Sequence, residues 1–106
     1  MGMKPKIVPF SMTDVSLQKK IAEICVDSAK VVVTKHAKTR MRERQVSLTQ
    51  VLHVLRKGSV VEPAHQDIHG YWKCTLASTI SGDFIKVAAA LKEESGEKVI
   101  VITVMN

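Results

Sequence analysis

The sequence has no apolar run long enough to cross a membrane. Its longest apolar stretches, residues 87–91 and 99–102, fall far short of the roughly 20 residues that a membrane-spanning helix needs. The first ten residues combine Lys4 and Lys6 with two prolines, and they lack the apolar stretch and small-residue cleavage pattern of a secretory signal. We therefore expect a cytoplasmic protein with no membrane association.

Cysteine is also scarce, and common cofactor motifs are absent. The two cysteines, Cys25 and Cys74, lie among largely apolar residues rather than in a CxxC or Cys/His cluster, which excludes a disulfide scaffold and a zinc finger. No P-loop, GxGxxG, GxSxG or HExxH motif is present, so nucleotide-dependent and triad-hydrolase chemistry have no support. His65, Asp67 and His69 flank one turn, but no further ligand stands at a convincing spacing. We expect no cofactor and no metal.

Glycine and proline are too few for a disordered or loop-rich chain. The 106 residues include five glycines and three prolines, and 45% of them are hydrophobic. This length and composition predict one domain with its own core. We expect a flexible N-terminal arm over residues 1–12 and a single folded domain over 13–106.

Positive charge is concentrated in one short segment. The chain has 16 Lys and Arg residues against ten Asp and Glu residues, which gives a formal charge of +6. Seven of these basic residues and one acid, Glu43, lie between positions 35 and 57, so the rest of the chain carries nine of each sign. The segment therefore predicts an anionic partner, for which we consider RNA. The residues expected to contact RNA phosphates here are Lys35, Lys38, Arg42, Arg56 and Lys57.

Apolar spacing predicts two helices and a short strand in the first half of the chain. Residues 13–28 form an amphipathic helix, with Thr13 or Asp14 as its N-cap. Residues 30–34 hold three consecutive valines, whose branched side chains favour a short buried strand. Residues 36–44 form a short basic helix.

A third helix has the clearest end signals in the sequence. It is expected over residues 48–57, because Ser47 and Gln50 form a capping box at its start. Gly58 stands where a left-handed residue would end the helix.

Four strands follow, separated by turn-like clusters that each contain a glycine. They are residues 59–65, 71–80, 83–91 and 98–105. Pro63 favours an edge position for the first of them, and the last, apolar on both faces, is expected in the sheet centre. The predicted fold class is α+β, with N-terminal helices followed by an antiparallel β-meander sheet.

Three residues of the basic helix share one row. His36, Arg40 and Arg44 are spaced by four, so they drift by only about 40° per step around the helix. The row lies beside the apolar stripe of the helix, which would partly desolvate it. Two arginines can hold a phosphate in bidentate fashion while an imidazole moves a proton, so the row predicts an RNA phosphate site. The alternative is a solvated basic helix in which Glu43 pairs with a neighbouring arginine.

The strand over 71–80 predicts a second group of functional residues. Trp72 alternates onto a core face, and Tyr71 and Lys73 alternate onto the opposite face. Lys86 of the next strand is expected to point the same way. A ring for base stacking beside cations for phosphates is typical of single-stranded nucleic acid binding. The alternative is an ordinary solvated sheet face.

The basic helix and the strands that follow also carry a family resemblance. The segment TKHAKTRMRER at 34–44 is followed by QVSLTQVLHVLRKGSVVE, a GYWK strand and a closing VIVITV strand. This pattern resembles a bacterial family of small domains of unknown function with an HAxxRMxER motif, over about residues 31–104. Members of that family look like RelE-type toxins, in which two helices precede an antiparallel sheet and relatives cleave RNA without a metal. The resemblance implies an antitoxin partner, and catalytic roles for His36, Arg40, Arg44, Tyr71 and Lys73.

The sequence departs from the toxin pattern at two places. RelE-type toxins often end in a catalytic tyrosine or arginine, which residues 104–106 do not supply, and residues 76–82 lack a middle-strand arginine. Either Tyr71 and Lys73 take over these roles, or catalysis is weak or absent. Two other functions stay open: RNA binding without chemistry, and binding of an acidic protein partner. The helix over 13–28 is unexplained by the resemblance, and we consider it for a homodimer or partner contact.

Overall fold

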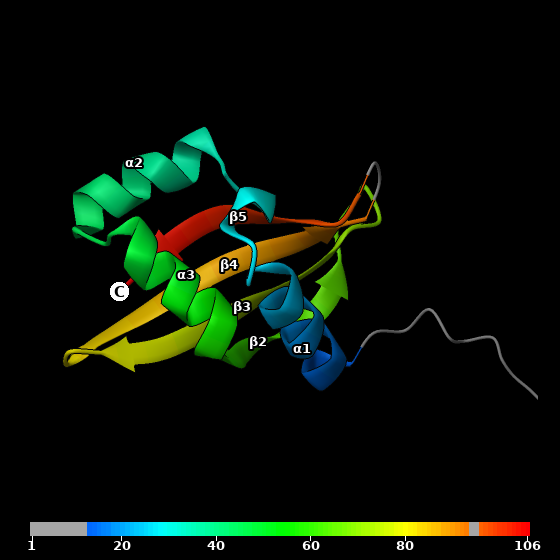
Figure 1. Cartoon of the computed structure of the whole chain (residues 1–106), viewed down its shortest axis with the longest axis horizontal. Helices are drawn as coiled ribbons and strands as arrows, with labels where there is room; N and C mark the ends of the chain where they lie inside the picture. Colours follow the sequence, from blue (N-terminus) through cyan, green and yellow to red (C-terminus); the bar gives the residue numbers. More distant parts are fainter. Residues whose placement is uncertain (1–12, 94–95) are drawn as a thin grey trace, which may run out of the picture.

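The fold is α+β, with three helices followed by a five-stranded sheet in the expected order. The computed structural model describes residues 13–93 and 96–106, so the predicted arm over 1–12 lies outside the described residues. The elements are α1 (Asp14–Ile24), the 3-10 turn η2 (Ser28–Lys30), β1 (Val31–Val33), α2 (Lys35–Arg44), α3 (Leu48–Lys57), β2 (Ser59–Gln66), β3 (Trp72–Ile80), β4 (Asp83–Lys92) and β5 (Lys98–Met105). Figure 1 shows α1 and α3 in front of the sheet and α2 alongside β5. None of the helices in the described part of the chain is long and apolar enough to span a membrane.

The strand order in the sheet is β1-β5-β4-β3-β2. Strands β2 to β5 form the expected antiparallel meander, and β2, which contains Pro63, lies at one edge as predicted. The short valine strand β1 pairs in parallel with β5, so that Val31 lies opposite Val99 and Val33 opposite Val101. The last strand, β5, is an interior strand as predicted, because β1 forms the edge beyond it and β4 lies on its other side. Helix α2 packs against β5.

Helix α1 begins at the expected cap and contributes its apolar face to the core. The Thr13 side chain accepts a hydrogen bond from the Ser16 amide, and the helix ends at Ile24 rather than near residue 28. Leu17 and Ile21 are fully buried against α3 and the sheet. A homodimer through this apolar face would require α1 to detach from α3 and the sheet of its own chain, because the face is already packed against them.

Helix α3 starts as predicted, but the backbone at its end differs from the prediction. The capping box of Ser47 and Gln50 is present as expected. Gly58 has φ −73° and ψ 164°, which is extended rather than left-handed backbone, so its predicted role is wrong. A glycine is needed at position 58 because the backbone is in close contact there: a Cβ would lie 2.5 Å from the Val54 carbonyl oxygen. The left-handed residue is instead Gln45, which ends α2 with φ 56°.

Both cysteines lie in the core, as their apolar surroundings predict. Cys25 and Cys74 are buried free thiols. Burial raises the pKa of each thiol to about 11, so both stay protonated at neutral pH. They are inert packing residues rather than nucleophiles.

Candidate functional site

Helix α2 is fixed to the sheet by an apolar stripe and by the residue that caps it. Ala37 is fully buried, and Met41 packs against the same core. The Thr34 hydroxyl accepts a hydrogen bond from the Ala37 amide and donates to the Val101 carbonyl oxygen at 2.9 Å. The start of α2 is therefore anchored to β5, and the basic side chains of α2 occupy its remaining surface.

The predicted row on α2 is present, but it lies largely in solvent. His36 and Arg44 are exposed, and the Arg40 side chain is 38% exposed. Arg40 Nη1 lies 3.4 Å from Glu43 Oε1, which makes an ion pair across one helical turn. Only Arg40 has the expected partial desolvation, and its pairing with Glu43 is what the solvated-helix alternative predicts.

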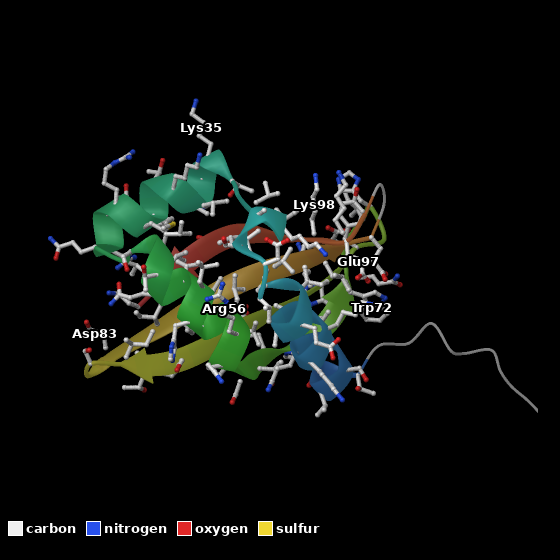
Figure 2. The ribbon with its side chains drawn as sticks, viewed as in Figure 1. Lys35, Arg56, Trp72, Asp83, Glu97 and Lys98 are labelled. Carbon is white, nitrogen blue, oxygen red and sulfur yellow. The ribbon has the colours of Figure 1, made fainter. Side chains whose placement is uncertain are left out.

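The other basic residues of the segment divide into free and committed side chains. Lys35, Lys38, Arg42 and Lys57 are exposed, and Figure 2 shows Lys35 projecting away from the start of α2. Among the described residues, no carboxylate lies within 4.0 Å of the cationic nitrogens of these four or of Arg44. They are available to bind an anion.

Arg56 differs, because it holds α1 in place. Its Nε donates a hydrogen bond to the Cys25 carbonyl oxygen at 2.7 Å, and its Nη2 donates to the Val26 carbonyl oxygen at 3.4 Å. These carbonyls lie at the C-terminal end of α1, where a cation is favourable. Much of the hydrogen-bonding capacity of Arg56 is therefore used within the chain.

The second predicted group lies on the sheet face opposite α1 and α3, which we call the open face. Lys73 and Lys86 are half-buried there, opposite Ala90 and Ala77 of the neighbouring strands, whereas Trp72 packs against the core on the other face. Tyr71 immediately precedes β3 and is half-buried. The structure thus places Lys73 and Lys86 on one face, four positions apart along the strands, with Tyr71 two residues before Lys73. It leaves His36, Arg40 and Arg44 as a separate group on α2.

Two irregularities in β2 turn further polar residues onto the open face. Residues three apart in a regular strand point to opposite faces. The register of β2 shifts on both sides of Glu62, so that Glu62 lies opposite Thr75 and His65 lies opposite Lys73. These shifts place both Glu62 and His65 beside open-face residues of β3.

Glu62 and His65 of β2, with Lys73 and Thr75 of β3, line a hollow of about 240 Å³ in the open face. The rest of its lining is Cys74, Ala88 and Ile102. Ile102 is the extra residue of a bulge in β5, because Ala88 pairs with Thr103 and Ala89 with Val101. A second hollow of about 610 Å³ shares His65 and Lys73 and extends over the β2–β3 turn. Together they form a groove from the turn to the middle of the sheet.

Hydrogen bonds fix the side chains at the bottom and rim of the hollow. Thr75 is only 4% exposed, and its hydroxyl donates to Glu62 Oε1 at 2.9 Å. His65 Nδ1 lies 3.2 Å from the Pro63 carbonyl oxygen. Because a carbonyl can only accept, this contact places a proton on Nδ1 and leaves Nε2 as the acceptor of the neutral ring.

The turn at the end of the groove is organised by Asp67. Its Oδ1 accepts hydrogen bonds from the amides of His69 at 2.8 Å and Tyr71 at 3.0 Å. Desolvation acts to raise the pKa of the Asp67 carboxyl, but these amide hydrogen bonds and the charge of Lys73 outweigh it and lower that pKa. The ordered turn holds the Tyr71 ring with its centroid 6.1 Å from that of His69.

Four lysines lie on the open face, and one of them, Lys73, lines the hollow. Lys73 and Lys86 alternate with core residues of β3 and β4, and Lys92 lies opposite Lys98 across β4 and β5. Alternation with buried neighbours puts this last pair on the same face. Glu62 is the acidic residue that lines the hollow. Because four lysines share this face, the open face is a second basic surface.

Strand alternation alone does not predict that Glu62 and His65 lie on the same face of the sheet. Counting by twos from Ser59 assigns residue 62 to the core face. The bulge between Val60 and Glu62 reverses that assignment, and the bulge between Glu62 and His65 keeps His65 on the open face as well. Pro63 was the available signal, because proline inside a strand marks an edge or a bulge.

Metal ligation has no support within residues 13–93 and 96–106, which contain no cluster of three His, Cys, Asp or Glu side chains able to hold a metal ion. His65, Asp67 and His69 share one turn, but Asp67 Oδ1 is occupied by two backbone amides. The chemistry available is that of lysine, histidine, carboxylate and hydroxyl groups.

Comparison with known proteins places the chain in a family. Residues 33–106 match a domain of unknown function, DUF4258. The chain belongs to the DUF4258 family. This agrees with the expected membership in a family of unknown function, and the DUF4258 region includes α2, α3 and strands β2 to β5 but not α1. No curated protein and no solved structure gives a significant match to the chain.

Proposed function

We propose that the protein binds single-stranded RNA through its phosphates and cleaves it without a metal, as the resemblance to RelE-type toxins implies. The observation that carries the proposal is the surface of α2, where Lys35, Lys38, Arg42 and Arg44 are exposed with no carboxylate partner among the described residues. Guanidinium and ammonium groups in this density suit a chain of phosphates.

The open face supports the same proposal with a different kind of contact. Lys73 and Lys86 offer cations for phosphates, and the half-buried Tyr71 offers an aromatic ring at the start of β3. Single-stranded nucleic acids bind to surfaces that combine a basic groove with stacking rings. The proposed catalytic residues are therefore either the α2 row of His36, Arg40 and Arg44, or the open-face pair of Tyr71 and Lys73.

A non-catalytic RNA-binding domain is the second candidate. The ion pair between Arg40 and Glu43 favours it for α2, because that pair is expected of a solvated basic helix and engages one of the two arginines of the row. An antitoxin partner and a homodimer through α1 stay predictions of the sequence.

Incubation of the protein with single-stranded RNA in the presence of EDTA tests the proposal. We expect cleavage at the same rate with and without EDTA, and products that end in 2′,3′-cyclic phosphates, because the attacking group is the neighbouring 2′-hydroxyl. Loss of cleavage in EDTA would contradict the metal-independent mechanism. Tight RNA binding with no cleavage would favour the second candidate.

A further inference from the structure

The hollow in the open face combines groups that α2 does not bring together. Glu62, His65 and Lys73 supply an acid, an imidazole and a cation around one space of about 240 Å³. His65 and Lys73 lie directly opposite each other across β2 and β3, so their side chains are neighbours. On α2, the carboxylate of Glu43 is instead used by Arg40.

The hydrogen bonds of the hollow leave specific atoms available. The Pro63 carbonyl holds the proton of His65 on Nδ1, so Nε2 carries the lone pair. The Thr75 hydroxyl donates to Oε1 of Glu62, which holds the carboxylate in place and leaves Oε2 with no hydrogen-bond donor among the described residues. The Lys73 ammonium has three donors and no carboxylate within 4.0 Å among those residues.

These groups fit a ribose-phosphate unit better than a simple anion. A carboxylate repels a bare phosphate, but it accepts a hydrogen bond from a sugar hydroxyl. A ribonucleotide offers its 2′-hydroxyl to an acceptor of the hollow, either Glu62 Oε2 or His65 Nε2, and its phosphate to Lys73 at the same time. A deoxynucleotide has no 2′-hydroxyl and should fit the hollow less well than a ribonucleotide.

We propose that the hollow holds the reacting ribose-phosphate unit of the RNA and that His65, rather than His36, accepts the proton of the 2′-hydroxyl; this inference rests on the proposed function. The 2′-hydroxyl loses its proton to His65 Nε2, and its oxygen forms a bond to phosphorus. The bond between phosphorus and the 5′-oxygen breaks, and the leaving oxygen takes a proton from the Lys73 ammonium. Water returns the proton from His65 to Lys73, so the protein is unchanged at the end.

Three histidine variants of the full chain test the inference. His65→Gln should lower RNA cleavage by about two to four orders of magnitude, the usual range for losing one general base, with RNA affinity within about twofold of the wild type. His53→Gln is the matched control, because its side chain is exposed on α3 outside the hollow, and it should cleave at the wild-type rate. His36→Gln tests the alternative base on α2. Thermal melts should show all three variants folded.

A binding measurement gives a second readout that does not depend on activity. Titration of the protein with ribonucleoside 3′-monophosphates, which keep the 2′-hydroxyl and have no 5′-oxygen leaving group to release, should shift the backbone amide NMR signals of Glu62, His65 and Lys73. Shifts confined to α2 would overturn the inference, and so would full cleavage by His65→Gln or its loss in His36→Gln. Those results leave the proposed function standing, whereas a wild-type protein that neither binds nor cleaves RNA overturns both.

Discussion

At the scale of single residues, Gly58 shows how contact rather than conformation can demand a glycine. A Cβ at this position would lie 2.5 Å from the Val54 carbonyl oxygen and 2.9 Å from the Ala77 carbonyl oxygen. Both atoms belong to the backbone, so neither can rotate away. Gly58 therefore lets the end of α3 approach β3 closely enough to begin β2.

Substitution of this glycine should destabilise the fold. We expect Gly58→Ala to lower the free energy of unfolding by about 1–3 kcal/mol, the range for forcing extra atoms into a packed site. Gly82→Asn is the control, since Gly82 has φ +87° with open space around it and asparagine tolerates the left-handed region. Urea denaturation of both variants measures the difference. Equal stabilities would contradict the contact explanation.

At the scale of elements, α1 is an addition to the DUF4258 region that is built into its core. Besides burying its apolar face, α1 covers the edge of β2: Asp14 Oδ1 accepts from the Ala64 amide at 2.7 Å, and Gln18 Oε1 accepts from the Val60 amide at 3.1 Å. An edge strand with capped amides is a poor template for another strand. Arg56 then fixes the other end of α1 through the Cys25 carbonyl.

Two neighbouring cations should therefore respond differently to removal. Arg56→Ala should lower the free energy of unfolding by about 1.5–3 kcal/mol, the range for hydrogen bonds of charged groups. Lys57→Ala should leave stability within about 0.5 kcal/mol of the wild type, as for most surface substitutions, but weaken RNA binding. Thermal melts and RNA titrations distinguish the two effects. A stable Arg56→Ala protein would show that α1 is held by packing alone.

The sequence was sufficient for elements whose signals are local. The capping box of Ser47 and Gln50 and the alternation around Trp72 both predicted what the structure has. Features that depend on pairing between distant strands could not be predicted from the sequence. The parallel pairing of β1 with β5 joins residues far apart in the chain, and the bulges beside Glu62 reverse a face assignment that local alternation predicts.

At the scale of the whole molecule, folding separates charges that balance in the sequence outside residues 35–57. The lysines of β3, β4 and β5 lie on the open face, and Lys73 lines its hollow. Acidic residues gather elsewhere: Lys20 of α1 pairs with Glu97 at 2.6 Å and with Glu93 at 4.0 Å, at the end of the sheet where Figure 2 labels Glu97. The hydrogen bond to Glu97, with the nearby carboxylates, raises the pKa of the Lys20 ammonium. The molecule therefore presents two basic surfaces, α2 and the open face.

The salt dependence of RNA binding tests this account most directly. Fluorescence anisotropy with a labelled single-stranded RNA should show the binding constant falling as salt rises, by roughly 0.7 log units per log unit of salt for each phosphate neutralised. The double variant Lys38→Ala, Arg42→Ala should bind more weakly and show a smaller slope, whereas Lys19→Ala, which removes one charge from exposed α1 surface, should keep the wild-type slope. Binding that does not change with salt, or an equal effect of the α1 and α2 variants, would contradict the central claim that α2 binds RNA phosphates.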